Sequence, residues 1–253
     1  MALLEVKGLT RDFGGLEAVS GLDLSLEEGE ILAIVGPNGC GKTTLFNLLT
    51  GALRPTAGSI RFAGRQIAGR PPYEIAALGI GRKFQVPSVF SELTLLQNLQ
   101  VAFLGGSASG GGNASGGARA LVGQHPDNAY CRRLLEVAGL SEKAGRPGGE
   151  LSHGERQKLE IVMVLAGKPR LFLLDEPTAG MTMAESEATV AMLKEIHAGA
   201  SAAFIVIEHD MQVVRSLQAP VAVMLRGQMM LLGSYEEVSG DPRVREAYLG
   251  QDG

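Results

Sequence analysis

Hydrophobic and polar residues alternate in two stretches near the N-terminus of the chain. Both LLEVKGL (3–9) and GLDLSL (21–26) follow this pattern, which is typical of antiparallel strands with one exposed face. GSIRFAG (58–64) predicts a further strand in the same region. These segments indicate an antiparallel β subdomain in the first part of the chain.

Other stretches are apolar almost without interruption. EILAIVG (30–36) and RLFLLDEP (170–177) have the continuous apolar runs of strands that are buried on both faces. AAFIVIEHD (202–210) has the same character. PVAVMLRG and QMMLLGS (220–234) predict a hairpin that turns at Gly227. Strands of this kind belong to a sheet that helices cover.

A helical period appears in several other segments. In residues 149–167 the apolar positions from Leu159 to Ala166 recur at the spacing of one buried helical face, and Ser152 with Glu155 fits a capping box at the start. Thr94 and Gln97 fit the sequence pattern of a second capping box. The other predicted helices cover 42–51, 128–140, 185–197, 234–238 and 243–250.

The arrangement of these elements predicts an α/β fold, a mixed sheet between helices with a helical insertion. The 253 residues suit a single domain, with a core at 1–85 and 159–234, a helical subdomain at 86–158 and a C-terminal helical extension at 235–253. Within the insertion, residues 104–123 are too rich in glycine and serine to bury enough surface, so we expect a flexible loop there.

The composition narrows the classes of function. A net charge of −4 and a pI of about 5.7 argue against a general nucleic-acid binder, which needs a basic surface. The two cysteines, Cys40 and Cys131, cannot form a disulfide framework and suit a reducing compartment. We find no signal-peptide pattern, and no stretch reaches the ~20 apolar residues of a membrane span. By itself the chain is expected to be soluble and cytosolic.

A glycine-rich turn lies between a predicted buried strand and a predicted helix. Its sequence, GPNGCGKTT (36–44), fits G-x-x-x-x-G-K-[ST], and strand–turn–helix is the context that this motif requires. Glycines let backbone N–H groups approach a phosphate, and the helix N-terminus adds a partial positive charge. The motif predicts binding of ATP or GTP, with Lys42 on the β- and γ-phosphates and Thr43 on Mg²⁺. The predicted phosphate-binding residues are Gly36, Pro37, Asn38, Gly39, Cys40, Gly41, Lys42, Thr43 and Thr44.

Two acidic residues end one of the predicted buried strands. Asp175 and Glu176 follow the apolar run LFLL, which delivers them to the carboxyl end of the sheet, where open α/β sheets bind ligands. Asp175 would hold Mg²⁺, and Glu176 would orient or deprotonate an attacking water. The pair predicts hydrolysis of the nucleotide and not binding alone.

In combination these motifs resemble those of the ATP-binding cassette subunits of ABC transporters. The glycine-rich turn at 36–44, called the P-loop, is followed by Gln85 in GRKFQVPS, by LSHGE (151–155), by LFLLDEP (171–177) and by His209 in IVIEHD. This is the order of the motifs in that family. The resemblance covers essentially the whole chain. It implies a P-loop NTPase (RecA-like) core with an N-terminal antiparallel β subdomain and an inserted α-helical subdomain.

The same resemblance implies roles for three further residues. Phe13 in RDFGG matches the aromatic residue that stacks on adenine, although a phenylalanine in a β region is otherwise most often a core residue. Gln85 would sense Mg²⁺ and the γ-phosphate. His209 would contact the γ-phosphate and the attacking water. The implied catalytic set is Glu176, His209, Lys42 and Gln85, and the implied metal set is Thr43, Gln85 and Asp175.

The resemblance also implies a second role for the helix that begins at Ser152. In cassettes of this family that helix points its N-terminus at the γ-phosphate held by a partner's P-loop. Ser152 would supply a hydroxyl and Gly154 a close backbone approach, and Glu155 completes the set. Two cassettes would close over two ATP molecules, so a monomer should be nearly inactive.

Two positions depart from the commonest pattern of the family. The signature motif of the family, which corresponds to residues 151–154 here, is usually Leu-Ser-Gly-Gly. In this chain His153 fills the third position. Many cassettes carry an Asp after the DEP motif that communicates across the dimer, and the alignment of DEPTAGMT puts Thr182 there. A hydroxyl can form a hydrogen bond but carries no charge, so that communication is in doubt.

Several stretches look like the cassettes of branched-chain amino acid and urea importers, among them GIGRKFQVPSVF (79–90), LSHG, DEPTAGM and DPRVREAYLG (241–250). GIGRKFQ with LSHG looks closer to the urea-type subunit, so urea is the expected solute and branched-chain amino acids are the alternative. The implied partners are a second cassette, two membrane permease subunits and, indirectly, a periplasmic solute-binding protein. The implied location is peripheral, on the cytoplasmic face of the inner membrane.

The surface near Gln85 is expected to couple the cassette to the membrane subunits. Phe90, Leu93 and Leu95 would surround a groove for a partner helix, or they would close the core of the insertion itself. Three other functions stay open: a soluble ABC ATPase that acts on nucleic acid or ribosomes, a small-molecule P-loop kinase, and a regulatory cassette that does not hydrolyse ATP. No nucleic-acid partner is expected.

Overall fold

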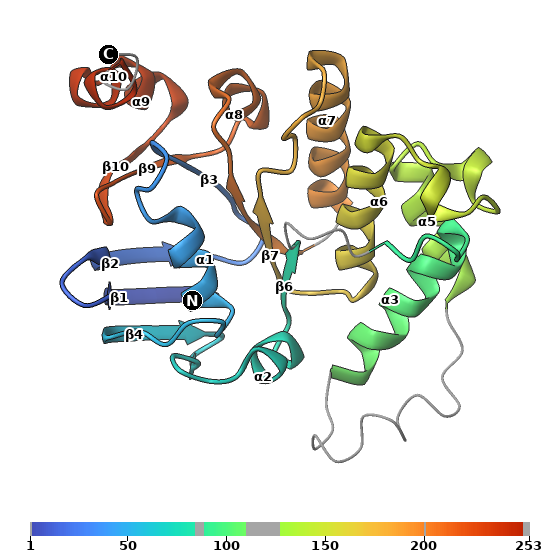
Figure 1. The fold of residues 1–253 in the computed structure, drawn as a ribbon, viewed down its shortest axis with the longest axis horizontal. Coiled ribbons are helices and arrows are strands. Elements are labelled where there is room, and N and C mark those ends of the chain that lie inside the picture. The colour runs from blue at the N-terminus through green and yellow to red at the C-terminus, as the bar shows by residue number, and fades with distance from the viewer. Residues whose placement is uncertain (1, 84–88, 110–126, 200, 250–253) are drawn as a thin grey trace. The chain divides into compact units, whose positions relative to one another are not determined.

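The computed structural model of the chain describes residues 2–83, 89–109, 127–199 and 201–249. These residues form two compact units (Figure 1). The first unit comprises Met1–Pro72 and Ala203–Gly253, and the second comprises Tyr73–Ala202. The predicted division of the domain into a core, a helical subdomain and a C-terminal extension stays a prediction.

An antiparallel sheet of four strands lies in the first unit, in the order β2-β1-β4-β5. The strands are β1 (Leu4–Asp12), β2 (Glu17–Leu26), β4 (Ala57–Phe62) and β5 (Arg65–Gln66). Leu4 of β1 is paired with Leu26 on one side and with Phe62 on the other, and all three side chains are buried. The alternation of the sequence thus places one apolar face of this sheet in the core.

Four more strands of the first unit are ordered β10-β9-β3-β8. They are β3 (Ile31–Val35), β8 (Ala203–Ile207), β9 (Val221–Leu225) and β10 (Gln228–Gly233). β3 runs parallel to both β8 and β9, whereas β9 and β10 form the predicted antiparallel hairpin. Because parallel strands end at the same edge, the turns after β3 and β8 lie at one edge of this sheet.

Three helices of the first unit, α1, α9 and α10, follow predicted segments, whereas α8 was not predicted from the sequence. α1 (Lys42–Leu49) begins directly after the glycine-rich turn and buries Leu45, Phe46, Leu48 and Leu49 completely. Its end is followed by Gly51 at φ 74°, a left-handed conformation that glycine adopts without strain. The remaining helices are α8 (Met211–Leu217), α9 (Tyr235–Gly240) and α10 (Pro242–Leu249).

The second unit combines two parallel strands with a group of helices. β6 (Ile80–Lys83) pairs with β7 (Leu171–Asp175), and the five side chains of β7 are all buried. The predicted capping boxes at Ser152 and Thr94 are both present. The helical elements are α2 (Pro72–Ala77), α3 (Leu95–Ser109), α5 (Asn128–Val137), η2 (Ser141–Lys143), η3 (Gly148–Glu150), α6 (His153–Ala166) and α7 (Met183–Gly199).

The α/β class that the sequence predicts is confirmed, with both an antiparallel sheet and helical parts. The prediction of a flexible loop at 104–123 is wrong for its first six residues, because α3 continues through Ser109. Extending an existing helix costs far less than nucleating one, so a helix anchored by buried Leu95 and Leu99 runs on into small residues. Residues 110–123 of the predicted loop lie outside the described residues.

Candidate functional site

The glycine-rich turn sits between β3 and α1, as the motif requires. A Cβ atom on Gly36 would lie closer than 3.0 Å to the backbone oxygen of Met224, and one on Gly41 would be equally close to the oxygen of Ala18. Such distances are not found in real proteins, so neither position accepts a larger residue while the turn keeps this shape. The backbone of β9 and of β2 therefore shapes the turn.

The N-terminus of α1 differs from those of the other capped helices. Its N-cap is Gly41, in the left-handed conformation at φ 107°, and it makes no side-chain capping bond. Its first turn contains no acidic residue. By contrast, Asp127, Ser152, Asp210 and Ser234 cap the helices α5, α6, α8 and α9 with their side chains. The first N–H groups of α1 and its partial positive charge fit an anion such as a phosphate.

Lys42, the first residue of α1, folds its side chain back over the turn. The side chain is 6 % exposed, and Nζ donates to the backbone oxygens of Gly36 at 2.6 Å and Pro37 at 3.0 Å. The ammonium group thus lies inside the turn that the motif assigns to phosphate. Thr43, predicted to bind Mg²⁺, is exposed at the next position.

Cys40 is buried inside the same turn. Its Sγ lies 3.7 Å from Lys42 Nζ, and its backbone oxygen accepts a hydrogen bond of 2.9 Å from the N–H of Gly227. Burial raises the pKa of the thiol above its ordinary value, and the ammonium of Lys42 opposes this only in part. The group is therefore a neutral thiol at pH 7.

His209 lies at the same edge of the sheet as this turn. The register of β3 and β8 pairs Ile34 with Ile207, so the glycine-rich turn and His209 each begin two residues beyond that pair. The N–H of Glu208 donates to the oxygen of Ile34 at 3.2 Å and continues the ladder by one step. His209 follows directly and is half-buried. Within the first unit, the structure thus brings the predicted phosphate turn and His209 to one edge.

Phe13 is not a core residue. It directly follows β1, and 46 % of it is exposed. The guanidinium carbon of Arg11 lies 4.4 Å from the centre of the ring, and Nη1 of Arg11 is fixed by the oxygen of Arg54 at 3.0 Å. The aromatic ring is therefore held on the surface, which a stacking role requires.

Asp175 lies in the second unit, at the carboxyl end of β7. Its Oδ2 is 3.2 Å from Nη2 of Arg82 on β6, and both side chains are buried. Burial lowers the pKa of the Arg82 guanidinium below its usual range, and the carboxylate of Asp175 opposes that shift. The predicted magnesium ligand thus has a fixed cationic neighbour that the sequence analysis did not identify.

Glu176 follows with an unusual backbone conformation. Its φ is 48°, in the left-handed region that residues with a side chain seldom adopt. A residue held there stores roughly 1 kcal/mol or more of strain, and such residues are concentrated at functional sites. The conformation turns the chain out of β7, and the Glu176 side chain is half-buried.

The signature helix α6 starts as predicted. Ser152 Oγ accepts from the N–H of Glu155 at 3.3 Å, and Glu155 Oε2 accepts from the N–H of Ser152 at 3.1 Å. Glu155 also pairs with Lys143, which is the main reason that the pKa of the Glu155 carboxyl is lowered. A Cβ atom on Gly154 would lie 2.7 Å from Oε1 of Glu185, so a side chain at this position would have to displace that carboxylate.

Both departures from the common family pattern have partners within the second unit. Nε2 of His153 lies 3.1 Å from the backbone oxygen of Ala179. Thr182 lies directly before α7, where its N–H and hydroxyl both donate to Oε2 of Glu185 at 2.9 and 2.8 Å. Glu185 in turn lies against Gly154. The two unusual residues therefore connect the start of α6 with the segment that follows Glu176.

A second cation on β6 was also missed by the sequence analysis. Lys83 is buried, pairs with Glu160 of α6 at 3.6 Å and contacts Gln157 of the same helix. The signal in the sequence was the pair Arg82-Lys83, which one residue separates from the predicted Gln85. Gln85 itself lies outside the described residues.

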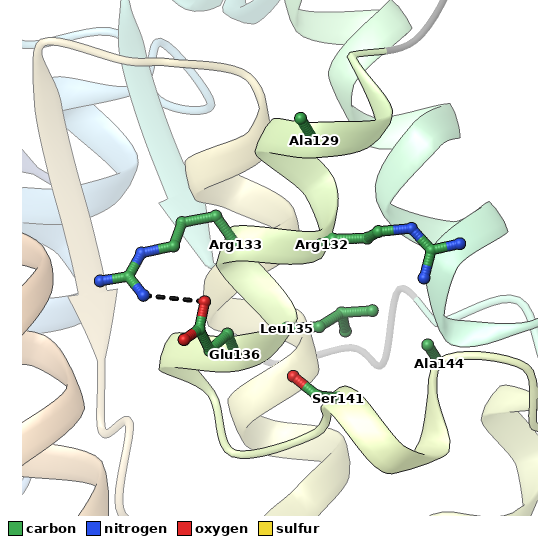
Figure 2. A pocket seen from close by; sticks show the side chains of 7 residues that line it. All are labelled: Ala129, Arg132, Arg133, Leu135, Glu136, Ser141 and Ala144. Carbon is green, nitrogen blue, oxygen red and sulfur yellow. Dashed lines mark ion pairs between the residues drawn. The ribbon is translucent and has the colours of Figure 1, made fainter.

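The predicted site residues thus fall into two groups, one in each unit. The group in the first unit comprises Phe13, the turn 36–44 and His209, and the group in the second comprises Ser152, Gly154, Glu155, Asp175 and Glu176. A separate hollow of about 320 Å³ contains none of them. Figure 2 shows this pocket, which is lined by Ala129, Arg132, Arg133, Leu135, Glu136, Ser141 and Ala144, with Arg133 paired to Glu136 at 2.8 Å.

Comparison with known proteins decides the family. The family model described as ABC transporter matches residues 19–179. The chain belongs to the ABC transporter family. A second family model, described as branched-chain amino acid ATP-binding cassette transporter, matches residues 232–253. The chain is therefore an ABC-type ATPase that uses ATP with Mg²⁺.

Similar proteins cover nearly the full length of this ABC cassette. It is 37 % identical to the high-affinity branched-chain amino acid transport ATP-binding protein BraF of Pseudomonas aeruginosa, over 98 % of both chains. It is 35 % identical to LivG of Escherichia coli K12, also a high-affinity branched-chain amino acid transport ATP-binding protein, with the same coverage. A crystal structure of an ATP-binding cassette of an ABC transporter in its ADP conformation matches with a TM-score of 0.85, 30 % identity and 99 % of each chain covered.

No helix among the described residues of this ABC cassette has the length and apolar character to cross a membrane.

Proposed function

We propose that the chain is the ATP-hydrolysing subunit of an ABC importer for branched-chain amino acids. The observation that supports this most strongly is similarity over nearly the whole length to ATP-binding proteins of branched-chain amino acid transport, together with the matching C-terminal family model. Urea, the solute that the sequence analysis favoured, has no support in the comparisons, whereas the alternative has. Urea stays a second candidate because of GIGRKFQ and LSHG alone.

The glycine-rich turn and α1 would hold the phosphates of ATP in this proposal. The N–H groups at the start of α1, where no side chain caps the helix, would bind phosphate oxygens, and Lys42 would turn its ammonium group from the turn's own carbonyls to the β- and γ-phosphates. The exposed ring of Phe13 would stack on adenine. Thr43, Gln85 and Asp175 would hold Mg²⁺, which neutralises charge on the phosphates when it is bound.

Glu176 and His209 would carry the chemistry. The left-handed backbone of Glu176 projects a half-buried carboxylate from the end of a buried strand, which suits a group that orients the attacking water and accepts its proton. His209 would contact the γ-phosphate from the edge that it shares with the phosphate turn. Gln85 completes the proposed catalytic set.

The start of α6 would serve a partner subunit. Ser152 is exposed, and its capping box uses only part of the N–H groups of the first turn. These groups would bind the γ-phosphate of ATP held by a second cassette, so that two cassettes close over two ATP molecules. A monomer should therefore have little activity.

Phe90 is the residue that supports a contact with the membrane subunits. It is 51 % exposed, whereas Leu95 is fully buried in the core of the insertion, and Leu93 is half-buried. The two predictions for these side chains therefore apply to different residues. Leu95 closes the insertion's own core, and Phe90 stays available to contact a permease. Two permease subunits would hold the cassette at the cytoplasmic face of the membrane, with a periplasmic protein supplying the solute.

A pull-down from detergent-solubilised native membranes tests this assembly. We expect a tagged chain to recover two membrane subunits and a second cassette, identified by mass spectrometry. The solute-binding protein encoded nearby would then be titrated with leucine and with urea, and leucine is expected to bind. Recovery of ribosomal or other soluble partners alone would leave an ATPase without the transport role.

A further inference from the structure

The loop between β7 and α7 is fixed at its two ends and at its middle. It starts at Glu176 with φ 48° and ends at Thr182, which binds Glu185 in the first turn of α7. Two turn bonds order the segment between them, from the N–H of Ala179 to the oxygen of Glu176 and from the N–H of Met181 to the oxygen of Thr178, each of 3.1 Å. Position 179 is thus the point at which an outside contact can shift Glu176.

That outside contact comes from α6. His153 is the first residue of the helix, and its Nε2 lies 3.1 Å from the oxygen of Ala179. A carbonyl oxygen only accepts, so Nε2 carries the proton and donates it. The ring also fits against Gly180, where a Cβ atom would lie 3.1 Å from Nε2. Gly180, at φ 74°, supplies both the space and the backbone conformation.

A second contact joins the same two elements. Oε1 of Glu185 would lie 2.7 Å from a Cβ atom on Gly154, so the first turns of α6 and α7 are packed without a gap. Glu185 is held there by Thr182, whose N–H and hydroxyl are the first causes of the lowered pKa of the Glu185 carboxyl. The start of the signature helix and the loop after Glu176 are therefore linked at two points, through His153 and through Glu185.

We propose that His153 is a positioning residue that ties the loop bearing Glu176 to the start of α6. This rests on the proposed function, in which the start of α6 binds the γ-phosphate of the partner's ATP. Engagement of that phosphate at Ser152 and Gly154 is then transmitted by His153 to Ala179, and from there to the carboxylate that acts on this cassette's own ATP. His153 and Thr182 together replace the charged cross-dimer link of the common pattern with a link inside one subunit.

Hydrogen exchange of the nucleotide-free, full-length chain tests the link directly. We expect His153→Ala to raise the exchange rate of the amides in residues 176–182 by roughly fivefold, the effect of one lost hydrogen bond. His153→Gln keeps an N–H donor at similar reach and should restore protection. His197→Ala removes a histidine near the other end of α7 and should leave the loop unchanged. Two results would overturn the proposal: exchange in His153→Ala at the wild-type rate, or exchange in His153→Gln as fast as in His153→Ala.

Steady-state kinetics of the assembled transporter tests the transmission. We expect His153→Ala to lower kcat by on the order of tenfold with little change in KM for ATP, because a misplaced catalytic group affects the reaction and not the binding of the nucleotide. His153→Gly restores the commonest signature of the family but also removes the ring, so it should behave as His153→Ala does. A loop that exchanges faster while kcat is unchanged contradicts the positioning role. If the wild-type assembly has no ATPase activity, the proposed function fails, and the exchange result still decides the link.

Discussion

Arg82 and Asp175 form a buried ion pair in which Nη2 lies 3.2 Å from Oδ2, with the two side chains 6 % and 1 % exposed. They stand 93 residues apart in sequence, on the adjacent parallel strands β6 and β7. The pair fixes one oxygen of the carboxylate that is proposed to hold Mg²⁺. It also places a permanent positive charge beside that ligand, since a guanidinium is not deprotonated in proteins.

Removal of one partner of this pair should destabilise the protein strongly. Arg82→Met leaves a buried carboxylate without its cation, and we expect a loss of about 3–5 kcal/mol in the free energy of unfolding. The double variant Arg82→Met/Asp175→Asn removes both charges and should recover most of that loss. Urea denaturation of the nucleotide-free chain measures both. An exposed pair provides the control, since Arg133→Met, which loses its contact with Glu136, should unfold as the wild type does. Equal stability of Arg82→Met and wild type would show that the pair does not form.

Substitution of the strained glutamate should separate binding from turnover. We expect Glu176→Gln to bind ATP with unchanged affinity, to lose turnover and to form an ATP-dependent dimer, with the sister cassette added if the homodimer is weak. The amide keeps the shape of the side chain but accepts no proton. Nucleotide titration, ATPase assays and size-exclusion chromatography report the three properties. Glu187→Gln, an exposed position on α7, is the matched control. Full hydrolysis by Glu176→Gln would remove Glu176 from the catalytic role.

Loss of the ammonium group in the phosphate turn should weaken nucleotide binding strongly. Lys42→Ala removes the charge that contacts the turn's carbonyls and that is proposed to reach the β- and γ-phosphates. We expect ATP affinity to fall on the order of 100-fold, as for the loss of charge-assisted bonds to a phosphate. Fluorescence titration with a labelled ATP analogue measures the affinity, and Lys7→Ala, which removes an exposed lysine of β1, is the control. An unchanged Kd would place the phosphates elsewhere.

Phe13, the exposed aromatic residue after β1, should contribute to binding of the adenine base and not to binding of the phosphates. We expect Phe13→Ala to weaken binding of ATP by roughly 10- to 100-fold, the range for loss of one base–aromatic stack. Phe13→Tyr keeps the ring and should bind normally. Binding of inorganic triphosphate should not change in either variant. Equal ATP affinity in Phe13→Ala and wild type would mean that the ring serves only its contact with Arg11.

Alkylation of Cys40 should be slow, pH-dependent and blocked by ATP. The thiolate is the reactive form, and burial raises the pKa of the Cys40 thiol, so the rate should rise with pH and should still be rising at pH 9. The assay uses Cys131→Ser, which leaves Cys40 as the single thiol. A modified Cys40 should prevent nucleotide binding, because the turn has no room for the adduct. Normal ATP binding after complete modification would show that the turn is not where the phosphates lie.

Local rules of the sequence predicted the elements of the candidate site well. The strand–turn–helix at 36–44, the capping box of Ser152 with Glu155 and the hairpin at Gly227 each depend on residues that are near one another in sequence. Their physical causes are backbone freedom and the satisfaction of N–H groups at helix ends, which a short window contains in full.

Contacts between distant segments were not predictable in the same way. Nothing near Arg82 in sequence shows that Asp175 will neutralise it, and His153 gave no sign that it would bind the oxygen of Ala179. These contacts depend on which strands pair and how two helices pack. The extent of α3 was missed for a related reason, because its glycine and serine residues follow a helix that is anchored by buried leucines.

Uptake by the reconstituted transporter tests the central claim most directly. The assembly recovered from membranes would be placed in proteoliposomes that contain ATP with Mg²⁺, given the solute-binding protein outside, and supplied with labelled leucine or labelled urea. The account predicts that leucine accumulates with the wild-type chain, that Glu176→Gln abolishes accumulation, and that urea does not compete. Accumulation of urea and not leucine, or uptake that is unaffected by Glu176→Gln, would contradict it.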